Sequence, residues 1–292
     1  MSFPKGMKKF MKEPLTTIAE KIKDADALFI GAGAGLSAAA GFEYGGATFQ
    51  KYFSYLTDKY GVNDMYSAGF APFESEEEFW GYWALAIYLN RYKDGAKTLY
   101  KEILNLVKDK DYFVLTTNVD HQFQLSGFDK ERLFYTQGDY GLFQSEDPSD
   151  QKTYDNEEWV RSVLPHIDPV THKIPTSMLP RTEDGKKMVM NLRCDESFVE
   201  DKGWHQACRR YYSFLDKVRD KKVVYLELGV GMNTPGIIKY PFWKYTYQNF
   251  HAFYICINKG EAYCPKEIEK RSLCVDGDLN EIIPKLVDSS NN

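Results

Sequence analysis

Closely spaced cysteines are missing from this sequence of 292 residues. Its cysteines are odd in number, and no two of them form a Cys-x-x-Cys pair: Cys194, Cys208, Cys256, Cys264 and Cys274. A disulfide framework needs an even, regularly spaced set, and a zinc ribbon needs two close pairs. The pattern therefore argues against both.

Long apolar runs and a strong net charge are also missing. The longest uncharged run, 27–42, is too short to cross a membrane and is rich in Gly and Ala. A net charge of -5 gives no electrostatic reason to expect nucleic acid or a membrane surface as a partner. The first residues contain no signal-peptide apolar core, so we expect a cytoplasmic protein. The length is ample for a sizeable core.

Short apolar runs alternate with helical patterns along the chain. This alternation is typical of an α/β protein whose parallel sheet has helices on both faces. Segment 42–69 has no steady period and predicts a loop with short helical pieces, while the polar, proline-punctuated segment 145–187 predicts an inserted module. The expected strands are 27–30, 111–116, 133–135, 223–228 and 253–257, and the expected helices are 14–25, 36–40, 76–90, 96–108, 204–219 and 279–287.

Three of the expected strands run directly into unusual loops, at 31–41, 117–120 and 229–235. In a parallel sheet, ligands bind outside the carboxyl ends of the strands. We therefore expect these three loops to meet at one crevice.

The first loop is glycine-rich and leads from a strand into a helix of small residues. Such a turn can place a pyrophosphate against backbone N–H groups at the start of the helix. The spacing differs from the dehydrogenase fingerprint, because Leu36 or Ala38 stands where the third glycine belongs. The alternative interpretation is a small-residue helix packed tightly on the sheet.

From Gly33 the sequence reads Gly-Ala-Gly-Leu-Ser-Ala-Ala-Ala-Gly-Phe, which resembles the NAD-binding signature of the sirtuin family in register. The family continues Pro-Asp-Phe-Arg, where this chain has Glu-Tyr-Gly-Gly at 43–46. This departure leaves open which residues of the cofactor loop cover the nicotinamide. The resemblance implies a cofactor-binding set of Gly33, Ala34, Gly35, Leu36, Ser37, Gly41 and Phe42.

The second loop, Thr-Thr-Asn-Val-Asp, resembles the sirtuin Thr-Gln-Asn-Ile-Asp, with Thr117 in place of the Gln. The resemblance implies that Asn118 positions the reacting ribose and that Asp120 binds the nicotinamide carboxamide. Taken alone, an Asn-x-Asp after a strand is also ordinary turn chemistry.

Gln137 stands where sirtuins carry the histidine that acts as general base on the ribose. A carboxamide can orient a ribose or an acceptor through hydrogen bonds, but it cannot remove a proton near neutral pH. His121 matches no catalytic position, so we interpret it as structural or surface. Asp139 is a possible substitute base, although a turn residue or helix cap is the preferred interpretation.

Later segments resemble the parts of sirtuins that contact ADP-ribose. The third loop resembles the corresponding sirtuin segment but is one residue shorter. The resemblance implies that the ADP-ribose lies against four of its residues, Gly229, Val230, Gly231 and Asn233. It also implies that Asn258 contacts the adenosine ribose and that Asp278 lies near the adenine.

Sirtuins usually hold their small domain with two Cys-x-x-Cys pairs around zinc. Segment 180–185 stands at the expected place and contains no thiol. A metal site built from Cys194, Cys208 and His205 is conceivable, but buried inert cysteines are the default interpretation. We therefore expect no metal ligands and no zinc.

Together, the motifs resemble the macrodomain-linked bacterial class of ADP-ribosylating sirtuins. The resemblance implies one catalytic region over 1–292 with a Rossmann-like NAD-binding domain (14–42, 96–144 and 204–287) and a smaller domain lacking a zinc ribbon (43–95 and 145–203). It implies transfer of ADP-ribose from NAD to a protein acceptor, a lipoylated carrier of the glycine-cleavage H type, and a functional link to a macrodomain hydrolase. The remaining alternatives are an NAD-dependent deacylase, an NAD glycohydrolase and an NAD-binding sensor.

Overall fold

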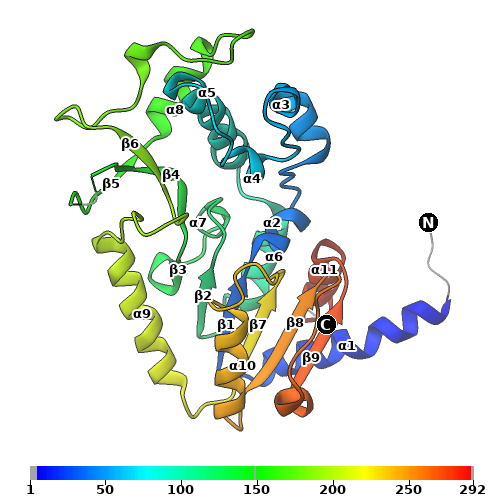
Figure 1. The fold of residues 1–292 in the computed structure, drawn as a ribbon. Coiled ribbons are helices and arrows are strands. Elements are labelled where there is room, and N and C mark those ends of the chain that lie inside the picture. Colours follow the sequence, from blue (N-terminus) through cyan, green and yellow to red (C-terminus); the bar gives the residue numbers. More distant parts are fainter. Residues whose placement is uncertain (1–4, 148, 291–292) are drawn as a thin grey trace.

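A six-stranded parallel sheet forms the lower part of the molecule in the computed structural model, which describes residues 5–147 and 149–290 (Figure 1). Its strand order is β3-β2-β1-β7-β8-β9, and every neighbouring pair is parallel. The predicted fold class, a Rossmann-like parallel sheet, is thereby confirmed. The strands are β1 (Ala27–Ala32), β2 (Tyr112–Thr116), β3 (Leu133–Tyr135), β7 (Val223–Leu228), β8 (Phe253–Asn258) and β9 (Ser272–Asp276).

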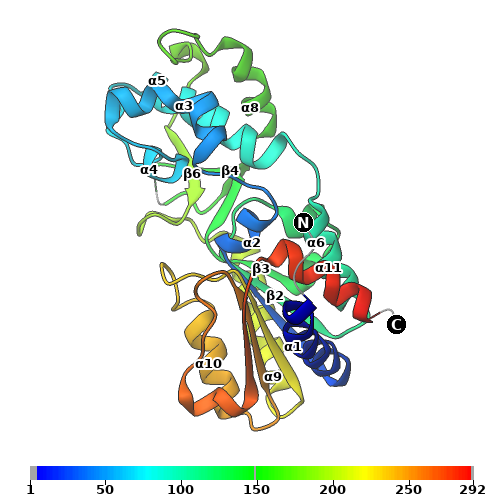
Figure 2. The ribbon, with the colours of Figure 1, turned by 90° about the vertical axis from the view of Figure 1, so that its right-hand side faces the viewer.

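Alternate side chains of β1 enter two separate hydrophobic cores, one on each face of this sheet. Leu28 and Ile30 join one core, whereas Ala27 and Phe29 join the other, because successive strand residues point to opposite faces. The first core lies under α1 (Lys5–Asp24), α6 (Thr98–Val107) and α11 (Leu279–Ser290), and the second lies under α9 (Lys202–Val218) and α10 (Lys239–Gln248). Figure 2 shows these two helical layers on opposite sides of the sheet.

A smaller, mostly helical unit lies beyond the carboxyl ends of the large sheet (Figure 2). A three-stranded antiparallel sheet of order β5-β4-β6 supports it, and its core is dominated by aromatic side chains. Its elements are α3 (Gly46–Tyr60), α4 (Met65–Ala68), α5 (Glu76–Ile87), the π-helical turn η1 (Tyr88–Tyr92), β4 (Gly138–Ser145), β5 (Thr153–Asp155), α8 (Glu157–Val163) and β6 (Met188–Leu192).

Short elements complete the chain: α2 (Ala34–Ala39), α7 (Gln122–Leu125), and the 3-10 turns η2 (Lys130–Arg132), η3 (Leu164–His166), η4 (Thr176–Met178) and η5 (Lys266–Arg271). Among the helices of the described residues, none is long and apolar enough to span a membrane.

The structure differs from the sequence-based expectations in several elements. Segment 42–69 contains the 15-residue helix α3 rather than a loop, because Phe49, Phe53 and Leu56 follow a helical spacing that the surrounding tyrosines and glycines obscure. Helix α10 and strand β9 were not predicted. Strand β4, which was assigned through residue 144 to the larger domain, pairs only with strands of the smaller sheet.

Candidate active site

The start of α2 and the loop after β7 touch through their backbones. Gly35 donates its N–H to the Gly229 carbonyl at 2.9 Å. A Cβ on either Gly33 or Gly35 would lie 2.8 Å from that same carbonyl oxygen. Gly229 has φ +63, and a Cβ there would lie 2.3 Å from the Leu36 nitrogen. Gly33, Gly35 and Gly229 are therefore required for the close approach of the first and third loops.

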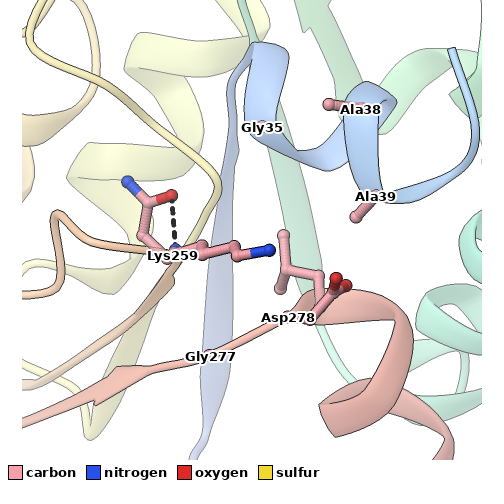
Figure 3. A pocket seen from close by; sticks show the side chains of 8 residues that line it. Gly35, Ala38, Ala39, Lys259, Gly277 and Asp278 are labelled. Carbon is pink, nitrogen blue, oxygen red and sulfur yellow. Dashed lines mark hydrogen bonds between the residues drawn. The ribbon is translucent and has the colours of Figure 1, made fainter. Parts of the chain in front are cut away.

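A cavity of about 280 Å³ lies beside this contact, at the carboxyl ends of β8 and β9 (Figure 3). Gly35, Asn258 and Asp278, three of the predicted cofactor-binding residues, line it. Asn258 is fixed by donating to the Val230 carbonyl at 3.1 Å. Asp278 directly precedes α11 and accepts the Asn280 N–H at 2.9 Å.

Lys259 also lines the cavity, and no sequence motif indicated it. Its side chain extends from the end of β8 across the cavity toward Asp278 (Figure 3). Gly277, from the same loop as Asp278, forms part of the wall. The cavity therefore offers a cation, a carboxylate and an amide around a floor of glycine and alanine.

A buried hydrogen-bond network joins the first two loops. The Ser37 hydroxyl donates to Asp120 Oδ2 at 2.5 Å, and Asn118 Nδ2 donates to the Gly33 carbonyl at 3.0 Å. The Tyr100 hydroxyl lies at the centre, 3.1 Å from Ser37 Oγ, 3.3 Å from Asn118 Nδ2 and 3.4 Å from Asp120 Oδ2. The structure therefore brings Ser37, Asn118 and Asp120 together, as the sequence predicted.

Burial sets the protonation of this network. Asp120 is only 2% exposed, and this burial raises the pKa of its carboxyl, helped by the nearby charge of Asp139 and opposed by the bonds from Ser37, the Gln122 N–H and Tyr100. Burial and the charge of Asp120 hold the pKa of the Tyr100 hydroxyl well above its usual range. The Tyr100 hydroxyl therefore keeps its proton and remains able to donate a hydrogen bond.

The other predicted residues lie outside this network. Gln137 is partly buried, and its carbonyl accepts the Arg193 N–H at 3.0 Å; no hydrogen bond of its side chain occurs within the described residues. Asn233 is exposed in the loop after β7. Phe42 is buried, and the Lys97 ammonium lies 5.0 Å from the centroid of its ring. The remaining predicted positions, Ala34, Leu36, Gly41 and Gly231, belong to the first and third loops.

Asp139 forms the expected turn, because its side chain accepts the N–H two residues further on, and it is also buried in an ion pair. Its Oδ1 accepts from Arg91 Nε at 3.0 Å and from the Gly141 N–H at 2.7 Å, and its Oδ2 bonds His121 Nδ1. Burial raises the pKa of this carboxyl, but the hydrogen bond from His121 and the charge of Arg91 outweigh that effect and lower it overall. Asp139 therefore remains ionised.

Two residues of this site, Tyr100 and Arg91, were not predicted from the sequence. Tyr100 lies beside Leu99 and Ile103 in an amphipathic pattern that predicted only core packing. Arg91 reaches Asp139 from 48 residues away, out of an aromatic segment. Among the described residues, no three His, Cys, Asp or Glu side chains gather as metal ligands would.

Curated proteins provide the first comparison. A protein ADP-ribosyltransferase of Staphylococcus aureus is 34% identical over 264 residues, which is 90% of this chain and 83% of that protein. A probable bifunctional ADP-ribose hydrolase/ADP-ribosyltransferase of Fusarium oxysporum is 33% identical over 94% of this chain, which spans about half (48%) of the fungal protein. No protein-family model matches the chain.

Solved structures provide the second comparison. A Sir2 enzyme bound to a propionylated peptide superposes with a TM-score of 0.61 at 14% identity and covers 95% of this chain and 98% of its own. A Sir2 enzyme bound to an acetylated peptide gives 0.60 at 15% identity, over 95% and 98% of the two chains. The fold is therefore that of the Sir2 enzymes, the sirtuins. The chain belongs to the sirtuin-like family of protein ADP-ribosyltransferases.

Proposed function

We propose that this enzyme transfers the ADP-ribose of NAD to a protein acceptor and releases nicotinamide. The observation that carries the proposal is the network of Ser37, Tyr100, Asn118 and Asp120 at the crevice, in a chain of this family that has Gln137 in place of the sirtuin histidine. The cavity beside Gly35 supports the proposal, because its polar groups suit an adenosine.

NAD lies along the crevice in this proposal. Asn258, Lys259 and Asp278 hold the adenosine end in the cavity, and Asn118 positions the nicotinamide ribose. Asn118 suits this task because its amide is fixed by the Gly33 carbonyl and Tyr100, so its orientation is set before the substrate binds. Gly229 and Val230 form the wall behind the pyrophosphate.

Asp120 acts mainly as a positioning residue. Its Oδ1 accepts the Gln122 N–H at 3.0 Å, and its Oδ2 receives Ser37 and Tyr100. Both oxygens are thus already engaged. The predicted bond from Asp120 to the nicotinamide carboxamide requires Ser37 to release its contact when NAD binds.

The residue at 137 decides between transfer and deacylation. Breaking the bond between the ribose and nicotinamide mostly requires a held leaving group and support for a cation-like ribose. Sirtuin deacylation then needs a base on a ribose hydroxyl, and Gln137 cannot act as one. Gln137 can still orient the ribose or the acceptor through hydrogen bonds.

We propose a lipoylated carrier protein of the glycine-cleavage H type as the acceptor, in a cytoplasmic setting. A macrodomain hydrolase then removes the ADP-ribose from the acceptor by hydrolysis. The fungal relative supports this link, because its name combines an ADP-ribose hydrolase with an ADP-ribosyltransferase.

The test is to incubate the purified enzyme with labelled NAD and purified lipoylated carrier, with unlipoylated carrier and an acylated peptide in parallel. Transfer predicts label on the lipoylated carrier and no deacylated peptide. Label on neither carrier form, together with deacylation of the peptide or with plain NAD hydrolysis, would contradict the proposal.

Two substitutions test the assigned roles. Asn118→Ala should lower the transfer rate about 100-fold or more, because it removes a preorganised acceptor, Oδ1 of Asn118, from the reacting ribose, and Gln137→Ala should lower it as well. Exposed residues of the same types, Asn105 on α6 and Gln248 at the end of α10, provide matched alanine controls. Rates in the Asn118→Ala or Gln137→Ala variants equal to those of the controls would refute the roles.

A further inference from the structure

Three irregular pieces of backbone meet at Asp139. Arg91 comes from the π-helical turn η1, His121 has φ +63, and Asp139 lies in the part of β4 where the pairing register shifts between Gly138 and Phe143. π-turns, left-handed non-glycine residues and β-bulges each occur preferentially next to active sites. Their convergence on one carboxylate points to a task beyond packing.

The pair of His121 and Asp139 follows directly on residues of the candidate active site. His121 directly follows Asp120, and Asp139 comes two residues after Gln137. The Tyr140 N–H bonds the Val119 carbonyl at 2.9 Å, which holds the start of β4 against the loop that carries Asn118. The pair is therefore adjacent to the candidate active site through both of its members.

Asp139 fixes the imidazole of His121. Its Oδ1 is occupied by Arg91 and the Gly141 N–H, which leaves Oδ2 for the ring. An imidazole that donates its Nδ1–H to an ionised carboxylate keeps a lone pair on Nε2. In the Ser-His-Asp triad, too, a carboxylate orients an imidazole, and the imidazole accepts the proton.

Asp120 and Asp139 each already accept three hydrogen bonds, whereas Nε2 of a neutral His121 ring keeps a lone pair for a further proton. His121 is 24% exposed, and no second hydrogen bond to its ring occurs in the described part of the chain. The charged and titratable groups around the pair are Asp120, Arg91, Tyr92 on η1 and Tyr135 on β3.

We propose that His121, oriented by Asp139, is the general base that takes the proton of the protein acceptor during ADP-ribose transfer. This inference rests on the proposed function. The bond between C1′ and the nicotinamide nitrogen breaks, and its electron pair neutralises the cationic ring. The acceptor atom forms the new bond to C1′, and its proton moves to Nε2 of His121. Gln137 then needs only to orient the reactants.

The first test is His121→Asn, assayed with labelled NAD and the lipoylated carrier. The Asn amide can donate to Asp139 from the position of Nδ1 but cannot take a proton. We expect a kcat at least 100-fold lower, an NAD affinity within twofold of wild type, and loss of the acid limb of the pH–rate profile. The exposed His251 before β8 supplies the control His251→Asn, which should match wild type.

The second test is chemical rescue. His121→Gly suits the positive φ at this position and leaves space for a free imidazole. Added imidazole should restore at least tenfold of the lost rate, which a merely structural role would not allow. Asp139→Asn should also lower kcat, because the amide no longer selects the Nδ1–H tautomer.

The outcomes separate the inference from the proposed function. If the wild-type enzyme labels no acceptor, both are overturned. If it does and His121→Asn keeps its rate within threefold, or loses NAD binding along with activity, only the base assignment is wrong. Glu43, an exposed carboxylate in the cofactor loop, is the competing base. A large loss in Glu43→Gln with none in His121→Asn would also overturn the inference.

Discussion

Replacing Tyr100 with Phe removes one oxygen atom from the centre of the active-site network. The aromatic ring would keep its edge-on contact with Phe123, at 4.9 Å between centroids. The hydroxyl takes part in contacts with Ser37, Asn118 and Asp120. After its removal, one N–H of Asn118 has no partner, whereas Asp120 Oδ2 keeps its bond from Ser37.

The loss of the Tyr100 hydroxyl should lower both the stability of the protein and its kcat. A buried donor left without a partner costs about 1–3 kcal/mol, which in a chain of this size lowers Tm by about 2 °C for each kcal/mol. Because Asn118 loses one of the two contacts that fix its amide, we also expect kcat for transfer to fall about tenfold or more, equivalent to about 1.4 kcal/mol of lost transition-state stabilisation.

The matched control is Tyr112→Phe. Tyr112 is also buried, and its hydroxyl accepts the Asp129 N–H at 3.2 Å, away from the crevice. Urea unfolding and steady-state transfer rates should show a similar loss of stability in both variants and a loss of kcat in Tyr100→Phe alone. If Tyr100→Phe is as active as Tyr112→Phe, the hydroxyl does not position Asn118 and the reasoning is refuted.

Three further predictions concern stability. Lys239 and Glu227 form a fully buried ion pair at 2.5 Å, so Lys239→Met should lower the free energy of unfolding by about 3–5 kcal/mol, as measured in urea. Gly35→Ala should cost about 1–3 kcal/mol and weaken NAD binding in calorimetry, because the new Cβ would lie 2.8 Å from the Gly229 carbonyl oxygen. The folded state lowers the pKa of Asp139, so its contribution to stability is present above the unfolded value and is lost as pH falls through the folded one. The gap in unfolding free energy between wild type and Asp139→Asn should therefore shrink in acid, and a constant gap would contradict this.

The sequence was informative where a motif follows a strand. Strand-then-loop patterns predicted that the loops after β1, β2 and β7 meet at one edge, and Ser37, Asn118 and Asp120 do lie together there, although the hydrogen bonds among these loops were not predicted. Helix α3 shows the limit of this approach, because its three buried positions carry a helical spacing that a high content of Tyr and Gly concealed.

The sequence did not predict which residues contact one another across long separations in the chain. Gly35 and Gly229 are 194 residues apart, and only the folded backbone shows that each glycine makes room for the other. Likewise, nothing near Asp139 in the sequence indicates that Arg91 and His121 surround it. Hydrogen-bond partners of buried charges depend on tertiary packing, which periodicity does not report.

Strand β4 is attached both to the smaller unit and to the loop after β2 of the large sheet. The strand pairs with β5 and β6 in the smaller sheet, while the Tyr140 N–H near its start donates to the Val119 carbonyl, between Asn118 and Asp120. Both attachments lie on one continuous strand. A rotation of the smaller unit against the large sheet must therefore either break this bond or carry the loop of Asn118 with it.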